Sequence, residues 1–232
     1  MPNHVSNKIT ISGPRTRVAE FLALGVYEPI DPATGKVSDY QRRAFSFRGF
    51  VPPPDHPDYN NDTCSHSHYN HRLGGGDPNP FCWNTWNPDN WGTKWDAYEV
   101  EVDSDLGVLD QLARVGTDST VASVAFQTAW SPPFPVFEKM ASLFSDCEFE
   151  FQWMNEDCRG AGGGHGSATN GQLAVVDGIN DPDNPLWRRM MMDLRGWSYA
   201  ELQELLDERE AERLADEEAE RLADEAAASE LP

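Results

Sequence analysis

The densest group of candidate metal ligands lies in the polar stretch 55–82. Cysteine and histidine recur there in the order Cys64, His66, His68 and His71. Thiolate and imidazole are the ligands that zinc prefers, so these four residues are candidate zinc ligands. Residues two apart on an extended chain point to opposite sides, and one ion could collect them only if the loop curls. The alternative is a solvated polar loop that binds no metal.

Tryptophan, asparagine and lysine form a second group in two segments rich in proline and asparagine. Its members are Trp83, Trp86, Asn90, Trp91, Lys94, Trp95 and Trp130. Indole rings at strand ends and loop bases either cap a hydrophobic core or line a recognition surface, where they stack on a base or anchor a partner protein. Lys94 lies between two tryptophans, and its stem could pack on an indole or its ammonium group meet a phosphate. These seven residues are the candidate binding site.

No known pattern of catalytic residues accompanies these groups. The sequence contains neither G-x-S-x-G nor H-E-x-x-H, and no pair of carboxylates is marked as catalytic by its spacing. The glycine-rich segment 160–166 lacks the Gly-Lys-Ser/Thr ending of a phosphate loop, so we expect a flexible hairpin there. We therefore lean towards a protein that is not an enzyme and that needs no cofactor, apart from the candidate zinc ion.

Charge and hydropathy narrow the class of partner. The 232 residues include 39 acidic and 18 basic side chains, a net charge of −21, so we do not expect direct binding to nucleic acid. No apolar run approaches the roughly 20 residues of a bilayer span, and the N-terminus lacks the hydrophobic stretch of a secretory signal. We expect a cytoplasmic protein without a membrane partner. The 4 cysteines are irregularly spaced, which favours reduced thiols.

The elements that position these residues follow from hydrophobic periodicity. Alternation predicts strands at 3–12, 44–51, 96–102, 120–128 and 147–154, with an edge strand at 171–176. Helical spacing predicts helices at 16–24, 106–115 and 136–144. Because helices interrupt the strands at uneven intervals, the fold class is α+β, an antiparallel sheet with helices on one face. We expect this domain to cover residues 1–180, with a long inserted loop at 52–93.

An acidic helical tail is expected over residues 181–232. Gly196 is its predicted break and Ser198 a predicted N-cap. The octad AERLADEE at 211–218 recurs almost unchanged at 219–226, so the leucine stripe drifts by about 80° per repeat and gives no straight coiled-coil seam. From residue 197 onward there are 13 acids and 3 arginines, a net charge of −10. Such a run is either a solvated tail or a partner-binding element.

Three segments carry a resemblance to a known family. MPNHVSNKITISG at 1–13, NWGTKWDA at 90–97 and FQTAWSPP at 126–133 resemble, in this order, the DUF1281 or Api92-like proteins of bacteriophages and conjugative plasmids. The resemblance covers roughly residues 1–180 and implies a ferredoxin-like domain in a mobile-element setting. It implies no biochemical role. The sequence departs from the family pattern in the His-rich loop and in the glycine-rich segment.

Three functions are open at this point. The leading hypothesis is a non-enzymatic accessory protein that counteracts a host defence or nucleic-acid-processing protein with a basic surface, through an acidic, Trp-rich surface. The second is a protein that sequesters a nucleotide-like small molecule between tryptophans, with Lys94 or Arg48 on the phosphate. The third is a zinc-dependent hydrolase built on the loop from Cys64 to His71.

Overall fold

The computed structural model describes residues 3–28, 44–59, 79–104, 119–156, 162–179, 181 and 184–229. Contacts divide the chain into two compact units, residues 1–180 and residues 181–232.

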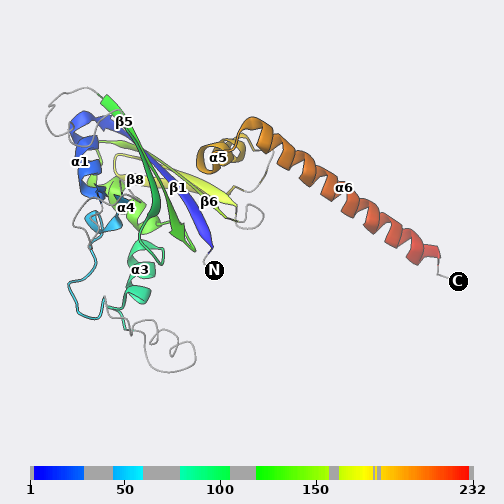
Figure 1. Ribbon diagram of the computed structural model, residues 1–232, viewed down its shortest axis with the longest axis horizontal. Coiled ribbons are helices and arrows are strands. Elements are labelled where there is room, and N and C mark those ends of the chain that lie inside the picture. The colour runs from blue at the N-terminus through cyan, green and yellow to red at the C-terminus, as the bar shows by residue number, and fades with distance from the viewer. Residues whose placement is uncertain are drawn as a thin grey trace. The chain divides into compact units, whose positions relative to one another are not determined.

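An antiparallel sheet of six strands forms the first unit (Figure 1). Its strands are β1 (His4–Pro14), β4 (Tyr98–Ser104), β5 (Ser119–Ala129), β6 (Glu148–Asn155), β7 (Gly163–Thr169) and β8 (Gln172–Ile179). They lie in the order β4-β5-β1-β6-β7-β8, and each neighbouring pair is antiparallel. Helices α1 (Arg15–Gly25) and α4 (Phe134–Leu143) pack on one face. The predicted α+β class is confirmed.

The connections make this sheet ferredoxin-like. Along the chain the elements run β1-α1-β4-β5-α4-β6, and in the sheet β1 lies between β5 and β6. This is a split βαβ arrangement repeated once, which β7 and β8 extend as a hairpin. The segment between α1 and β4 is a long insertion, and it supplies most of the candidate site.

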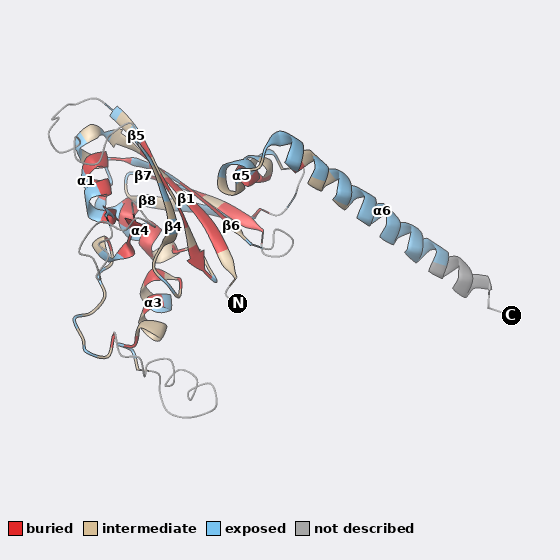
Figure 2. Cartoon of the chain, viewed as in Figure 1, coloured by how far each residue is buried: buried red, intermediate tan, exposed pale blue. Residues whose placement is uncertain are grey.

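Alternation along the central strand builds the core. Val5, Ile9 and Ile11 of β1 are fully buried under the helices, and Ile9 lies between Val124 of β5 and Phe151 of β6. Figure 2 shows this buried face along the strands and on the facing sides of α1 and α4. A fully buried side chain of this size stabilises the fold by about 1.5–3 kcal/mol. The core extends to the edge strand β4, where the insertion joins the sheet, because Val100 and Val102 pack against it.

The predicted strand at 44–51 is wrong beyond its first residues. Only Ala44–Phe45 forms a strand, β3, which pairs with β2 (Val26–Tyr27), and a 3-10 turn, η1 (Phe47–Gly49), follows. The Asp96 carboxylate caps the turn by accepting from the Phe47 N–H at 2.8 Å, and Gly49 lets the turn pass against α1, where an added Cβ would lie 2.0 Å from the Leu24 carbonyl oxygen. The phenylalanines of the segment still enter the core, so their spacing imitates a strand.

Two segments expected as loops are regular elements. Helix α3 (Trp83–Trp91) occupies the end of the expected loop 52–93, whose residues 60–78 lie outside the described part. The glycine-rich segment enters β7, because Gly164 lies directly under an indole: its Cβ would be 2.1 Å from Trp153 Cζ2. The helix expected at 106–115 lies outside the described residues. The other predicted strands and helices agree with the structure to within a few residues.

The second unit consists of two helices, α5 (Pro185–Arg195) and α6 (Tyr199–Ser229). Gly196 ends α5 in a left-handed conformation with φ 66°. Ser198 caps α6: its Oγ accepts from the Glu201 N–H at 3.3 Å, and Glu201 Oε2 accepts from the Ser198 N–H at 2.8 Å. The predicted break, N-cap and C-terminal helix are confirmed. In the described part of the chain, no helix has the length and apolarity to span a membrane.

Candidate functional site

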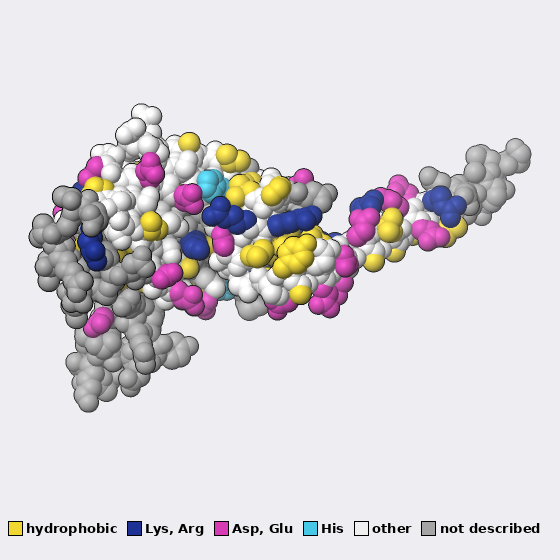
Figure 3. Space-filling model, turned by 90° about the horizontal axis from the view of Figure 1, so that it is seen from above, with side chains coloured by type: hydrophobic (Ala, Val, Ile, Leu, Met, Phe, Trp, Pro, Cys, Tyr) yellow, Lys and Arg dark blue, Asp and Glu magenta, His cyan; other side chains and the backbone are white. Residues whose placement is uncertain are grey.

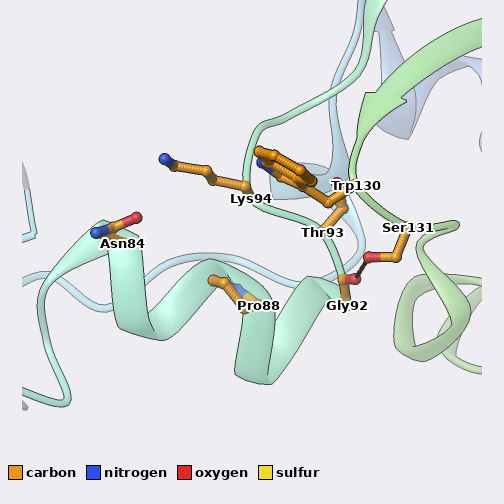
Figure 4. A pocket seen from close by; sticks show the side chains of 7 residues that line it. All are labelled: Asn84, Pro88, Gly92, Thr93, Lys94, Trp130 and Ser131. Atoms are coloured by element: carbon orange, nitrogen blue, oxygen red, sulfur yellow. Dashed lines mark hydrogen bonds between the residues drawn. The ribbon is translucent and has the colours of Figure 1, made fainter. Parts of the chain in front are cut away.

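A hollow of about 440 Å³ lies between α3 and the connection from β5 to α4. Its lining consists of Asn84, Pro88, Gly92, Thr93, Lys94, Trp130 and Ser131 (Figure 4). In Figure 4, Lys94 and Trp130 extend to the same side of the hollow, with Asn84 and Pro88 on α3 opposite them. The hollow therefore combines an indole, a cation and several short polar side chains.

Helix α3 forms one wall, although its sequence contains Pro88. Proline cannot donate to the Asn84 carbonyl one turn back, so that carbonyl loses its helical partner. Gly92 ends the helix with φ 77°, and its N–H donates to the Pro88 carbonyl at 3.1 Å. Position 92 requires glycine, because the backbone there is left-handed and an added Cβ would also lie 2.7 Å from Pro135 Cδ.

Trp91 attaches α3 to the core. Its side chain is 1% exposed, its Nε1–H donates to the Val51 carbonyl at 2.9 Å, and its ring meets Phe47 edge-on. Trp86 lies edge-on to both Trp91 and Tyr59. These two tryptophans cap the core.

Asparagine side chains fix the helix to the turn that follows it. Asn87 is buried; its Oδ1 accepts from the Tyr59 hydroxyl at 2.8 Å, and its Nδ2 donates to the Lys94 carbonyl at 3.0 Å. Asn90 Nδ2 donates to the Trp86 carbonyl within the same helix. Asn87 thus positions the backbone that carries Lys94.

Trp130 is exposed and strained. Its side chain is 55% exposed, and its backbone has φ 78°, a conformation that bulky residues rarely adopt. Hydrogen bonds on both sides hold it there. The Trp130 N–H donates to the Asn3 carbonyl at 2.8 Å, and Thr93 Oγ1 donates to the Ala129 carbonyl at 2.8 Å. Thr128 Oγ1 donates to the Ser131 carbonyl at 2.9 Å.

Lys94 supplies the cation of the hollow. Its Nζ lies 5.8 Å from the centroid of the Trp83 ring, a cation–π contact between the ammonium group and this indole. Among the described residues Lys94 forms no ion pair. Of the seven residues that line the hollow, Lys94 carries the positive charge.

Trp95 lies on a different part of this surface. It is 38% exposed and lies edge-on to Tyr98, 6.2 Å between centroids. The Tyr98 hydroxyl lies 2.5 Å from His4 Nδ1. Of the seven candidate binding residues, Lys94 and Trp130 line the hollow, Trp83 contacts Lys94, and the other four lie elsewhere in the packing or on the surface.

The second candidate phosphate ligand, Arg48, lines another hollow, of about 540 Å³. Arg48 Nε lies 3.9 Å from Asp96 Oδ2, and Asp96 accepts hydrogen bonds from Ser46 Oγ and the Phe47 N–H. Burial raises the pKa of Asp96, and these hydrogen bonds oppose the shift. The Asp96 carboxylate thus caps η1 and faces Arg48, so Arg48 and Lys94 do not share a site.

The candidate zinc ligands Cys64, His66, His68 and His71 lie outside the described residues. Within the described part, no group of three or more potential ligands gathers to hold a metal ion. Cys82 is in a disulfide bond whose partner also lies outside that part, so the expectation of reduced thiols is wrong for this residue. Cys147 is free and buried, and burial raises its pKa to about 11.

Sequence reasoning missed several residues of the hollow. Pro88, Gly92, Thr93 and Ser131 were not predicted, although three of them adjoin a predicted residue in the chain. Their signal would have been that adjacency, together with the glycine that ends α3.

A match to a family model supports the fold. Residues 112–181 match the family model described as a ferredoxin-like domain in Api92-like protein. Among solved structures, the chain is similar to the crystal structure of a protein api92 from Yersinia pseudotuberculosis, with a TM-score of 0.38 and 7% sequence identity. The similarity covers 76% of this chain and 98% of that chain. No curated protein matches the sequence.

Proposed function

We propose that this chain is a non-enzymatic accessory binding protein, encoded by a bacteriophage or plasmid, that acts in the cytoplasm of a bacterial host. Its partner is a host defence or nucleic-acid-processing protein with a basic surface. The observation that carries the proposal is Trp130, a largely exposed indole held in a strained conformation at the mouth of a hollow. The resemblance to phage and plasmid proteins supports the setting.

Strain at Trp130 supports a binding role. A bulky residue at positive φ costs about 1–3 kcal/mol, and such strain persists where the surrounding structure over-determines it, often at functional sites. Because the indole is largely exposed, its burial in the fold does little to offset this cost. Tryptophans of this kind, beside a hollow, are typical anchors of protein interfaces.

Negative charge supports a basic partner. The net charge is −21, and the run from residue 197 carries −10 of it. Complementary charge speeds the encounter of two proteins and selects against partners of the same sign. Trp130 would then supply contact, and α6 would supply attraction.

Capture from a bacterial lysate tests the proposal. The immobilised full chain should retain one basic host protein at low salt and release most of it at high salt. The Trp130→Asn variant should lose this capture, because asparagine tolerates positive φ but provides no indole. Trp95→Asn is the matched control, since Trp95 is exposed but does not line the hollow. If nothing is retained at either salt concentration, or if Trp130→Asn retains as much, the proposal is wrong.

A second candidate function is the sequestration of a nucleotide-like small molecule. The observation that favours it is Lys94, which forms no ion pair with the described residues and lies beside Trp130 in a hollow of about 440 Å³, a volume within the usual range for small-molecule sites. A base would stack on the indole and a phosphate would meet the ammonium group. Nucleotides added to the protein should quench tryptophan fluorescence, and Lys94→Met should abolish the effect. No quenching across a panel of nucleotides would rule this candidate out.

A further inference from the structure

Helix α6 presents apolar residues in different directions along its length. Near its start, Leu202 is 2% exposed, and Leu206 lines a hollow together with Arg188 of α5. From Glu210 to Leu222 every side chain is exposed (Figure 2). Leu214 and Leu222, in this second part, are each 52% exposed. At about 100° per residue, Leu222 lies roughly opposite Leu202 and Leu206 on the helix, and Leu214 lies about 80° from Leu206 and about 120° from Leu202. The second part therefore does not continue the packing of α6 on α5.

The exposed part is amphipathic over twelve residues. A stripe of alanine and leucine, the Ala/Leu stripe, spans an arc of about 140° and is interrupted only by Glu218. It consists of Ala211, Leu214, Ala215, Ala219 and Leu222. The six residues on the remaining arc are all charged. An apolar stripe of this width is normally buried against another element.

Charge decides what can cover the stripe. One flank carries only acids, Glu212, Asp216 and Glu220. On the other flank, Arg213 is paired with Glu210 and Glu217, and Arg221 lies 3.8 Å from Glu218. Figure 3 shows acidic and hydrophobic side chains next to one another along α6. Because the run carries −10, a second copy of α6 would be repelled, whereas a helix with lysine or arginine beside its own apolar face would be attracted.

We propose that the Ala/Leu stripe docks a basic amphipathic helix of the partner protein. This inference rests on the proposed function and names the surface of α6 that makes contact. Helices bind helices in this way through residues spaced by three or four, with charges at the rim. The small alanines let the partner helix approach closely, and the two leucines are its main apolar contacts.

Two synthetic peptides of identical composition provide the test. Both contain leucine, alanine and lysine; one has its leucines at helical spacing and the other has them scattered. The full chain should bind the patterned peptide roughly tenfold tighter than the scattered one, a difference about equal to burying two leucines partway. The double variant Leu214→Gln/Leu222→Gln should reduce this difference to less than about threefold. Circular dichroism should show unchanged helix content, because glutamine is a good helix former and both sites are exposed.

Tyr199→Gln is the matched control. Tyr199 is an apolar residue of the same helix, 66% exposed and outside the stripe, so this variant should keep the full preference for the patterned peptide. Equal binding of both peptides, or no effect of the double leucine variant, would overturn the inference. The proposed function would survive that result if host protein were still captured through Trp130. Conversely, if the chain preferred the patterned peptide but captured no host protein, the Ala/Leu stripe would still bind basic helices, and the proposed function would be wrong.

Discussion

At the residue scale, tryptophan has two opposite roles in this protein, one in the core and one on the surface. Trp91 is buried and donates its indole N–H to a backbone carbonyl, whereas Trp130 is mostly exposed on a strained backbone. Both belong to segments rich in proline and asparagine. Their type and spacing are similar, and only the backbone conformation and the burial separate them.

Unfolding measurements should separate these two tryptophans. Trp91→Ala should lower the free energy of unfolding by about 3–5 kcal/mol, because it opens a cavity and leaves the Val51 carbonyl without its donor. Trp130→Asn should change it by less than about 1 kcal/mol, since strain relief offsets the lost contacts. Urea denaturation followed by circular dichroism checks both. Similar losses for the two variants would show that Trp130 is a packing residue.

Alkaline pH should weaken the fold through Tyr98. Burial, with Glu99 and Glu156 nearby, raises the pKa of Tyr98 to about 12, against 10.0 for an ordinary tyrosine. Between these values the unfolded chain loses the tyrosine proton more readily than the folded chain does, so stability falls as pH rises through this window. Tyr98→Phe should be less stable at neutral pH, by about 1 kcal/mol for the lost hydrogen bonding. Its urea midpoint should then fall less between pH 10 and 12. A midpoint that falls equally in both proteins would contradict the assignment.

At the element scale, the hairpin β7-β8 depends on one glycine. Trp153 of β6 lies across Gly164 of β7, which is its cross-strand partner. The indole can pack flat on the sheet only because Gly164 has no side chain. This is why a glycine-rich segment forms a strand between β6 and β8 here.

Substitution of Gly164 should lower the stability of the protein more than substitution of a neighbouring glycine on the same strand. Gly164→Ala should destabilise the protein by about 1–3 kcal/mol, because the new methyl group forces the buried indole to move. Gly166→Ala, on the same strand, meets its nearest atom at 3.2 Å and should cost less. Thermal unfolding of the two variants gives the comparison. A greater loss for Gly166→Ala would show that the indole does not determine this strand.

Regular alternation made the central strands predictable, and the exceptions have identifiable causes. Strands β1, β5 and β6 were predictable because one of their faces is buried along most of its length. Helix α3 was not, because Pro88 and three asparagines mask its periodicity. The strand predicted at 44–51 contains a turn that Asp96, far away in sequence, caps. Such long-range hydrogen bonds leave no local signal.

In the candidate site, too, the residue types could be predicted from the sequence but the backbone conformations could not. Lys94 and Trp130 could be singled out by type, because Lys94 lies between two tryptophans and Trp130 is an indole in a segment rich in proline. The hollow itself depends on the positive φ of Gly92 and of Trp130, on the hydrogen bond that Thr93 donates from the insertion to Ala129, and on the one that Thr128 donates to Ser131. A sequence read alone does not give these conformations. It also does not separate the core-capping indoles from the exposed one.

At the scale of the whole molecule, negative charge and the indole site should affect different rate constants. Long-range attraction acts before contact, so screening by salt should lower the association rate constant for the host partner. We expect a decrease of about tenfold or more between roughly 0.05 M and 0.5 M salt, because the Debye length shortens severalfold over this range. Trp130 makes contact only in the complex, so Trp130→Asn should raise the dissociation rate constant and leave association nearly unchanged. Surface plasmon resonance with the captured partner measures both constants. If salt acted mainly on dissociation, the charges would lie inside the interface, and if Trp130→Asn slowed association, the indole would take part in the encounter itself.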